Sequence, residues 1–193
     1  MIEYKEIFWV ISVILTLVWY YIYIKDIYFW QNRPHFFSWF VWGLITMIIY
    51  FIQIANNPWA WSWTVLFTFC ISFLIAFISL WKWTKDITFS DIVSLIFAFV
   101  TISLWFFIEN KIFSLILLVL IDIFGYYPTI RKSFKNPFEE NYMLYLLSIP
   151  KFWLAILALN EINLETSLYL FANLIILVFL VLVIVIWRRN KNI

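Results

Sequence analysis

Charge, glycine, histidine and cysteine are all scarce in this chain of 193 residues. Only 12% of the residues are charged, about half of the roughly 25% that is usual in a soluble domain. Because 66% are hydrophobic, too few polar side chains are present to cover a surface that faces water. The two glycines are too few for a glycine-rich loop that binds phosphate.

The single histidine, His35, and the single cysteine, Cys70, limit the chemistry further. They allow no metal site of recognisable ligand spacing and no Ser-His-Asp or Cys-His arrangement within a membrane. We expect Cys70, inside an apolar run, to pack as a small apolar residue. His35 follows Pro34 in a polar break, where we expect it to face solvent or lipid headgroups. The sequence therefore predicts no enzyme, no cofactor and no metal.

Long apolar runs separated by short polar breaks make up most of the chain. A hydrocarbon core of ~30 Å needs about 20 helical residues, and prolines at Pro34, Pro58 and Pro137 lie in breaks where helices must start or stop. The pattern predicts an all-α, polytopic membrane protein with seven transmembrane helices. The predicted spans are Ile7–Ile24, Phe36–Ala55, Ala60–Trp81, Phe89–Ile108, Ile112–Ile130, Tyr142–Leu159 and Thr166–Trp187.

Basic residues are distributed unequally between the two sides of these spans. One side has only Lys5 and Lys111. The other side comprises the breaks after the first, third and fifth spans and the C-terminal tail, and it holds Lys25, Arg33, Lys82, Lys85, Arg131, Lys132, Lys135, Arg188, Arg189 and Lys191. Because basic loops stay in the cytoplasm, we expect the N-terminus outside and the C-terminus in the cytoplasm. A composition typical of AT-rich prokaryotic genomes predicts the plasma membrane.

Two ends of a three-span unit recur at the same spacing of 106 residues. The segment from Tyr20 to Lys25 resembles that from Tyr126 to Arg131, and Leu80-Trp81-Lys82 resembles Ile186-Trp187-Arg188. The sequence thus predicts a three-helix repeat at 1–85, a linker helix within 86–110 and a second repeat at 111–193. Such parallel repeats are related by an axis along the membrane normal, with a solute site between them near mid-depth.

The layout and one motif carry a resemblance to a known family. The segment Tyr126-Tyr127-Pro128 precedes Arg131-Lys132-Ser133, and Thr129 stands at the position of a glutamine in that family. With the 3+1+3 layout, the chain resembles the SWEET and PQ-loop superfamily of membrane carriers. The resemblance implies alternating access with Pro128 and Pro150 as hinges, although Ile22 and Met47 stand at these places in the first repeat.

The resemblance also implies a substrate contact for Asn173 in the seventh span, because SWEET carriers use an asparagine on the last helix of each repeat. Its counterpart in the first repeat is Phe67, so the symmetric hydrogen-bonding partners of a sugar site are lost. An interhelical hydrogen bond is the alternative role for Asn173. Trp42, Tyr126 and Tyr145 are candidates to line a cavity or simply to pack.

Two charged residues, Asp122 and Lys151, are predicted near mid-depth of the fifth and sixth spans. A charge there is costly unless it is paired or hydrated, which makes each one a functional candidate. Asp122 could take up a proton when buried and release it when water enters. The alternative is a structural ion pair between the two helices. Pro150 precedes Lys151 and predicts a break in the sixth helix, whereas Glu139 and Glu140 are expected to be solvated at a helix start.

These observations favour a carrier for a small polar solute, charged or zwitterionic, that works by alternating access. Its predicted substrate-binding residues are Asp122, Lys151, Asn173, Tyr126 and Trp42. The alternative is a non-transporting membrane subunit or receptor with a structural Asp122–Lys151 pair. The predicted partners are the lipid bilayer, a small-molecule solute and coupling protons. The basic residues form a thin girdle that suits anionic lipid rather than nucleic acid, and self-association into a homo-oligomer is left open.

Overall fold

The computed structural model describes residues 4–29, 32–55, 60–83, 87–157, 159 and 161–191. Within these ranges the chain is all-helical, which confirms the predicted all-α class and the seven helices. The predicted break at Asn56–Trp59 and the predicted boundary between residues 85 and 86 lie outside the described residues. The helices are α1 (Tyr4–Tyr28), α2 (Phe36–Ala55), α3 (Ala60–Trp83), α4 (Phe89–Trp105), α5 (Lys111–Lys135), α6 (Tyr142–Leu157) and α7 (Leu164–Lys191), with a short 3₁₀ helix, η2 (Pro137–Glu139), before α6.

Local capping explains several helix starts. The side chain of Asn110 accepts hydrogen bonds from the backbone N–H groups of Ile112 and Phe113, at 3.0 and 3.2 Å, and so caps α5. Thr88 and Asp91 form a capping box at the start of α4. At the basic end, α5 and α7 extend beyond the predicted spans, to Lys135 and Lys191.

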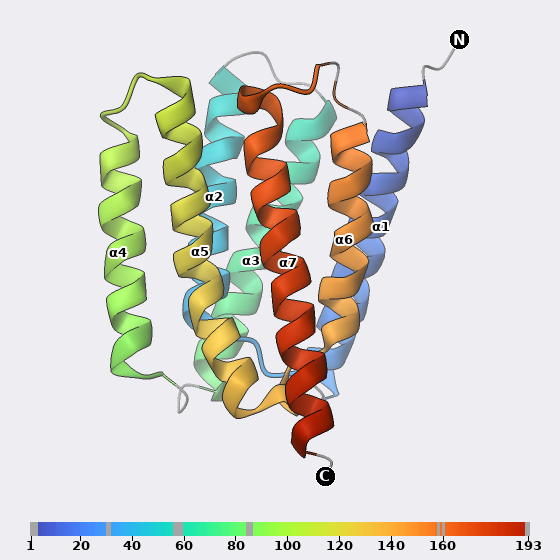
Figure 1. Cartoon of the computed structure of the whole chain (residues 1–193), viewed down its shortest axis with the longest axis vertical. Helices are drawn as coiled ribbons and strands as arrows, with labels where there is room; N and C mark the ends of the chain where they lie inside the picture. Colours follow the sequence, from blue (N-terminus) through green and yellow to red (C-terminus); the bar gives the residue numbers. More distant parts are fainter. Residues whose placement is uncertain are drawn as a thin grey trace.

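The helices run alternately up and down, so the N- and C-termini lie at opposite ends of the bundle (Figure 1). On one side α3 packs against α2, and on the other α7 packs against both α5 and α6. Two contacts join these sides, α1 with α6 and α2 with α5, and α4 packs along α5. The three helices of each predicted repeat therefore face the other three across a central interface, with α4 outside it.

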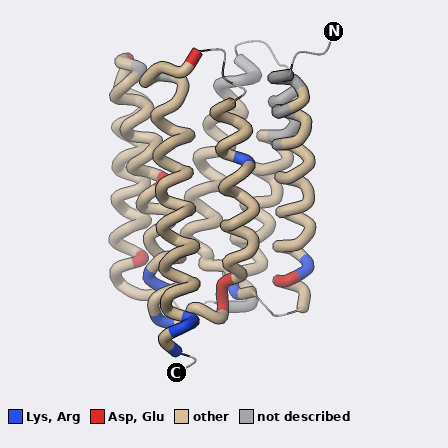
Figure 2. Tube along the Cα trace, turned by 45° about the vertical axis from the view of Figure 1, so that its right-hand side comes forward, with Lys and Arg blue, Asp and Glu red and all other residues tan. Residues whose placement is uncertain are grey.

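The surface of the bundle is rich in large apolar side chains, and its interior contains several charged ones. Large apolar side chains are exposed along the outer faces, and α7 alone exposes Phe171, Ile175, Val178, Phe179, Leu182, Val185 and Ile186. The buried set instead includes charged or amide side chains such as Asp91, Asp122, Lys132 and Glu140. Most charged residues gather at the end of the bundle that carries the C-terminus (Figure 2). This distribution is the reverse of that in a soluble protein.

Two helical segments among the described residues are long and apolar enough to cross a membrane, Ile112–Lys135 and Thr166–Lys191. The other apolar segments that qualify by composition are shorter. For example, α4 and α6 have 17 and 16 residues, which is roughly 25 Å at 1.5 Å per residue. By length and composition, the described residues thus support a membrane-protein assignment through two of the seven predicted spans.

Both predicted hinge prolines lie inside continuous helices, so the prediction that Pro150 breaks the sixth helix is wrong. Pro128 has no N–H to donate to the carbonyl of Phe124, four residues earlier. The hydroxyl of Ser94 on α4 donates to that carbonyl instead, at 2.8 Å. Such replacement bonds allow a proline inside a membrane helix. Pro150 lies on the exposed face of α6.

Candidate functional site

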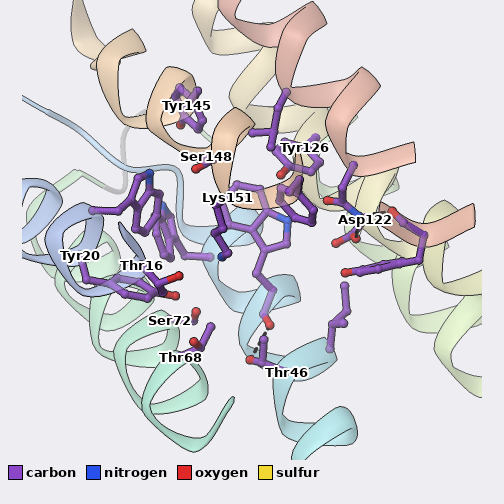
Figure 3. Close-up of a pocket in the computed structure, with 18 residues that line it drawn as sticks. Thr16, Tyr20, Thr46, Thr68, Ser72, Asp122, Tyr126, Tyr145, Ser148 and Lys151 are labelled. Carbon is purple, nitrogen blue, oxygen red and sulfur yellow. Dashed lines mark hydrogen bonds between the residues drawn. The ribbon is translucent and has the colours of Figure 1, made fainter. Parts of the chain in front are cut away.

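A cavity of about 160 Å³ lies at the centre of the bundle, between α1–α3 and α5–α7 (Figure 3). Each of these six helices contributes side chains to its wall. The five residues predicted to bind substrate all line it: Trp42 on α2, Asp122 and Tyr126 on α5, Lys151 on α6 and Asn173 on α7. The structure therefore brings together every predicted substrate-binding residue, while their role in binding stays a prediction.

Asp122 is held in place by α7. Its side chain is only 3% exposed and accepts a hydrogen bond from the amide nitrogen of Asn173 at 2.9 Å. The side chain of Tyr169 bonds to the same carboxylate. Asn173 also donates to the backbone carbonyl of Tyr169, at 3.2 Å, which fixes its orientation. The interhelical hydrogen bond weighed for Asn173 is thus present, and it positions Asp122 at one wall of the cavity.

Lys151 makes no ion pair or hydrogen bond with any described residue; its ammonium lies 5.5 Å from the ring centroid of Phe152. The direct Asp122–Lys151 pair, which the structural alternative requires, is not formed. The physical reason is the packing order, because α7 lies between α5 and α6 and supplies the partners of Asp122. The Lys151 side chain extends into the middle of the cavity (Figure 3).

Hydroxyl groups from the first three helices face these charged residues. Thr16 on α1 and Thr68 and Ser72 on α3 line the cavity, and Figure 3 shows them across from Asp122 and Tyr126. Sequence reasoning missed these residues, but the repeat spacing carried a signal for one of them. Thr16 stands 106 positions before Asp122, as Tyr20 does before Tyr126, and all four line the cavity.

A layer of buried aromatic side chains lies between the cavity and the basic end. Trp39 donates from its indole N–H to the hydroxyl of Tyr23 at 2.9 Å, and the two rings pack with centroids 4.7 Å apart. Tyr145 donates to the carboxylate of Glu140 at 2.8 Å, and Leu144 beside it is fully buried. Trp39 is thus a core residue.

Beyond this layer, the segment before α2 is bonded to the segment before α6. The backbone N–H of Arg33 donates to the carbonyl of Glu139 at 3.0 Å, and the side chains of these residues pair at 3.3 Å. Lys132 pairs with Glu140 at 2.8 Å and also donates to the carbonyl of Arg33. The prediction of a solvated Glu140 is wrong, because the side chain is only 1% exposed and accepts from Lys132 and Tyr145.

A second buried group, next to the start of α4, ties three helices together. Arg131 on α5 donates two hydrogen bonds to the carboxylate of Asp91, at 2.7 and 2.8 Å. The Nε2 atom of His35, just before α2, lies 3.3 Å from the same carboxylate. The prediction of a solvent-facing His35 is also wrong: its side chain is 2% exposed, because it packs against Asp91 and the ring of Phe37.

No protein-family model, no curated protein and no solved structure matches this chain. The resemblance to the SWEET and PQ-loop carriers therefore stays a prediction from the residues that carry it.

Proposed function

We propose that this chain is an integral membrane carrier that moves a small polar solute by alternating access between two three-helix units. One observation carries the proposal: a cavity lined by α1–α3 and α5–α7 holds a buried carboxylate, Asp122, and an ammonium, Lys151, that has no ionic or hydrogen-bonding partner among the described residues. A charged group is rarely retained inside an apolar bundle without a function. Solute sites of carriers with parallel repeats lie at this kind of interface, near mid-depth.

The exposed apolar faces support seven spans for this carrier. A soluble protein rarely exposes contiguous apolar surface on this scale, whereas lipid requires it. Besides the two long segments, α2 and α3 have 20 and 24 residues, or about 30 and 36 Å. The shorter α4 is followed by Phe106 and Phe107, which are both exposed. A bilayer that thins locally accommodates a span that is a few ångströms short.

The helix contacts support two related units and, with them, the resemblance to SWEET and PQ-loop carriers. In the predicted repeats, α1 and α2 correspond to α5 and α6. The contact of α1 with α6 therefore has the contact of α5 with α2 as its counterpart, and both contacts are present. In this arrangement the bonded segments and the aromatic layer close the basic end, which we place in the cytoplasm by its charge.

Uptake by reconstituted vesicles tests this function. The purified protein is placed in liposomes, and entry of radiolabelled sugars, amino acids, nucleosides and carboxylates is measured. We expect saturable uptake of one solute class, its loss in Asp122→Asn, and normal uptake in Glu109→Gln, which makes the same chemical change at an exposed residue. Normal uptake by folded Asp122→Asn protein, or no uptake of any class by the folded wild type, would contradict the proposal.

The alternative of a non-transporting subunit or receptor is supported less well. It rests on a structural Asp122–Lys151 pair, and the described side chains show Asp122 bonded to Asn173 instead. A purely structural role also leaves the cavity without an explanation, because packed apolar side chains would stabilise the interface more effectively than an unpaired lysine.

A further inference from the structure

The cavity holds its two charged groups in different ways. Asp122 lies at the wall and already accepts hydrogen bonds from α7. Lys151 extends into the middle of the cavity (Figure 3) and has no anionic or hydrogen-bonding partner among the described residues. Removing a cation from water without a counter-charge is costly. The cavity is therefore complete only when something else supplies the negative charge next to Lys151.

The groups near Lys151 suit an anion that also accepts hydrogen bonds. The hydroxyl groups of Thr16, Ser72 and Ser148 line the same cavity. They have partners within the bundle, such as the Leu144 carbonyl for Ser148 at 3.1 Å, and a hydroxyl can turn its hydrogen from such a partner to an anionic acceptor. The remaining wall is largely aromatic, with Trp42 and Tyr126 in ring contact at 4.8 Å. A charged head beside the ammonium and a small body against the rings would fill this space.

The charge of the cavity limits the ligand to a single negative group. Lys151 is the one cation that lines the described cavity, and the carboxylate of Asp122 opposes any second negative charge. With the carboxylate of Asp122 counted, a solute with one carboxylate leaves one negative charge in excess, which an ammonium group on the solute balances. A phosphate or dicarboxylate would leave two or more. At about 10–15 Å³ for each water-sized site, the cavity of about 160 Å³ admits a solute of roughly ten non-hydrogen atoms.

We propose that the solute of this carrier is a small monocarboxylate, whose carboxylate binds between the Lys151 ammonium and the hydroxyl groups of Thr16, Ser72 and Ser148. This inference rests on the proposed function and names the substrate class of the same cavity. The carboxylate of Asp122, at the opposite wall, accepts a hydrogen bond from a hydroxyl or ammonium group of the solute. Every solute of this class has a carboxylate. The group that donates to Asp122 is a hydroxyl in hydroxy acids and an ammonium in amino acids.

Thermal unfolding of the detergent-purified protein tests the substrate class without knowledge of the natural solute. The probes are propionate, lactate, glycine, alanine and threonine, each compared with its own amide, which lacks the negative charge. A ligand that binds only the folded state raises its apparent stability as its concentration exceeds Kd. We expect an acid to raise the midpoint temperature and its amide to have no effect. Equal shifts from acid and amide, or no shift from any acid, would overturn the proposal.

Two lysine variants locate the binding site. We expect Lys151→Met to weaken acid binding at least tenfold and Lys135→Met, at an exposed lysine, to leave it unchanged. An acid-induced shift that survives in Lys151→Met would overturn the proposal. If Lys151→Met does not fold, the comparison of acids with amides in the wild type still decides the matter.

Vesicle uptake then separates this inference from the proposed function. Saturable uptake of a neutral sugar that is unaffected by Lys151→Met would support the carrier function and overturn the proposal that the solute is a monocarboxylate. Acids that bind at Lys151 but never cross the bilayer would support the proposed binding site and contradict the proposed carrier function.

Discussion

The basic end of the bundle and its central cavity differ in whether their buried cations are paired. At the basic end, Lys132 pairs with Glu140 and Arg131 pairs with Asp91, and each carboxylate accepts several hydrogen bonds. In the cavity, Lys151 has no such partner among the described residues. Charges that hold a structure together are paired, because an unpaired one destabilises the fold. The paired charges indicate a structural role for the first region, and the lack of a partner for Lys151 is the basis of our proposal that the second region binds a ligand.

The largest expected loss of stability comes from breaking the Lys132–Glu140 pair. Its side chains are 4% and 1% exposed, so Lys132→Met leaves a buried carboxylate with Tyr145 as its remaining side-chain donor. We expect the free energy of unfolding to fall by ~3–5 kcal/mol, measured by denaturant titration in detergent. Unchanged stability would show that water reaches Glu140 and that the basic end is not closed as described.

Asp91→Asn should cost somewhat less. The asparagine keeps one oxygen acceptor but turns an amide group toward the donors of Arg131 and Thr88. We expect a loss of about 2–3 kcal/mol, typical of charge-assisted hydrogen bonds. Thermal unfolding checks the value, and the exposed carboxylate variant Glu109→Gln serves as the control. Equal midpoints for the two variants would contradict the role of Asp91 in joining α2, α4 and α5.

The bond from Ser94 to the Phe124 carbonyl should contribute about 1 kcal/mol, as interhelical hydrogen bonds do in membranes. Ser94→Ala removes the donor that replaces the missing N–H of Pro128. In the Pro128→Ala background the helix regains its own N–H donor, so we expect the same serine substitution to cost less there. A double-mutant cycle measures the coupling, and additive effects would show that Pro128 and Ser94 are independent.

The pair of Arg33 and Glu139 should be the weakest of those at the basic end. Their side chains are 46% and 23% exposed, and pairs of this kind contribute ~0–1 kcal/mol. We expect Arg33→Gln to change the unfolding free energy by less than 1 kcal/mol and the change to shrink further at high salt. A loss as large as that of Lys132→Met would mean that exposure does not separate the pairs as the account requires.

The helices were largely predictable from the sequence, and the network at the basic end was not. Apolar runs and proline-marked breaks predicted α2 with its observed bounds, Phe36–Ala55, because these signals are local. Sequence reasoning placed His35 and Glu140 in water because they lie in polar breaks. Their burial depends on contacts with residues brought close only by the fold, such as Asp91 for His35 and Tyr145 for Glu140.

The candidate site divides in the same way. Asp122 and Lys151 were identified because a charged residue inside an apolar run can be recognised from the sequence alone. Both line the same cavity in the structure. Their separation was not predictable, because the partner of the interhelical hydrogen bond weighed for Asn173 could not be read from the sequence, and in the fold that partner is Asp122. A serine such as Ser72 could not be assigned to a cavity from the sequence alone. Thr16 could have been, because it stands at the repeat spacing from Asp122.

A direct test compares the same substitution in the two regions, Lys132→Met and Lys151→Met, by the unfolding free energy of the ligand-free protein. We expect a loss of ~3–5 kcal/mol for Lys132→Met. For Lys151→Met we expect an unchanged or raised stability, because that substitution removes a cation that has no partner among the described residues. A comparable loss in Lys151→Met would show that Lys151 holds the fold together, and it would contradict the assignment of the cavity to a solute.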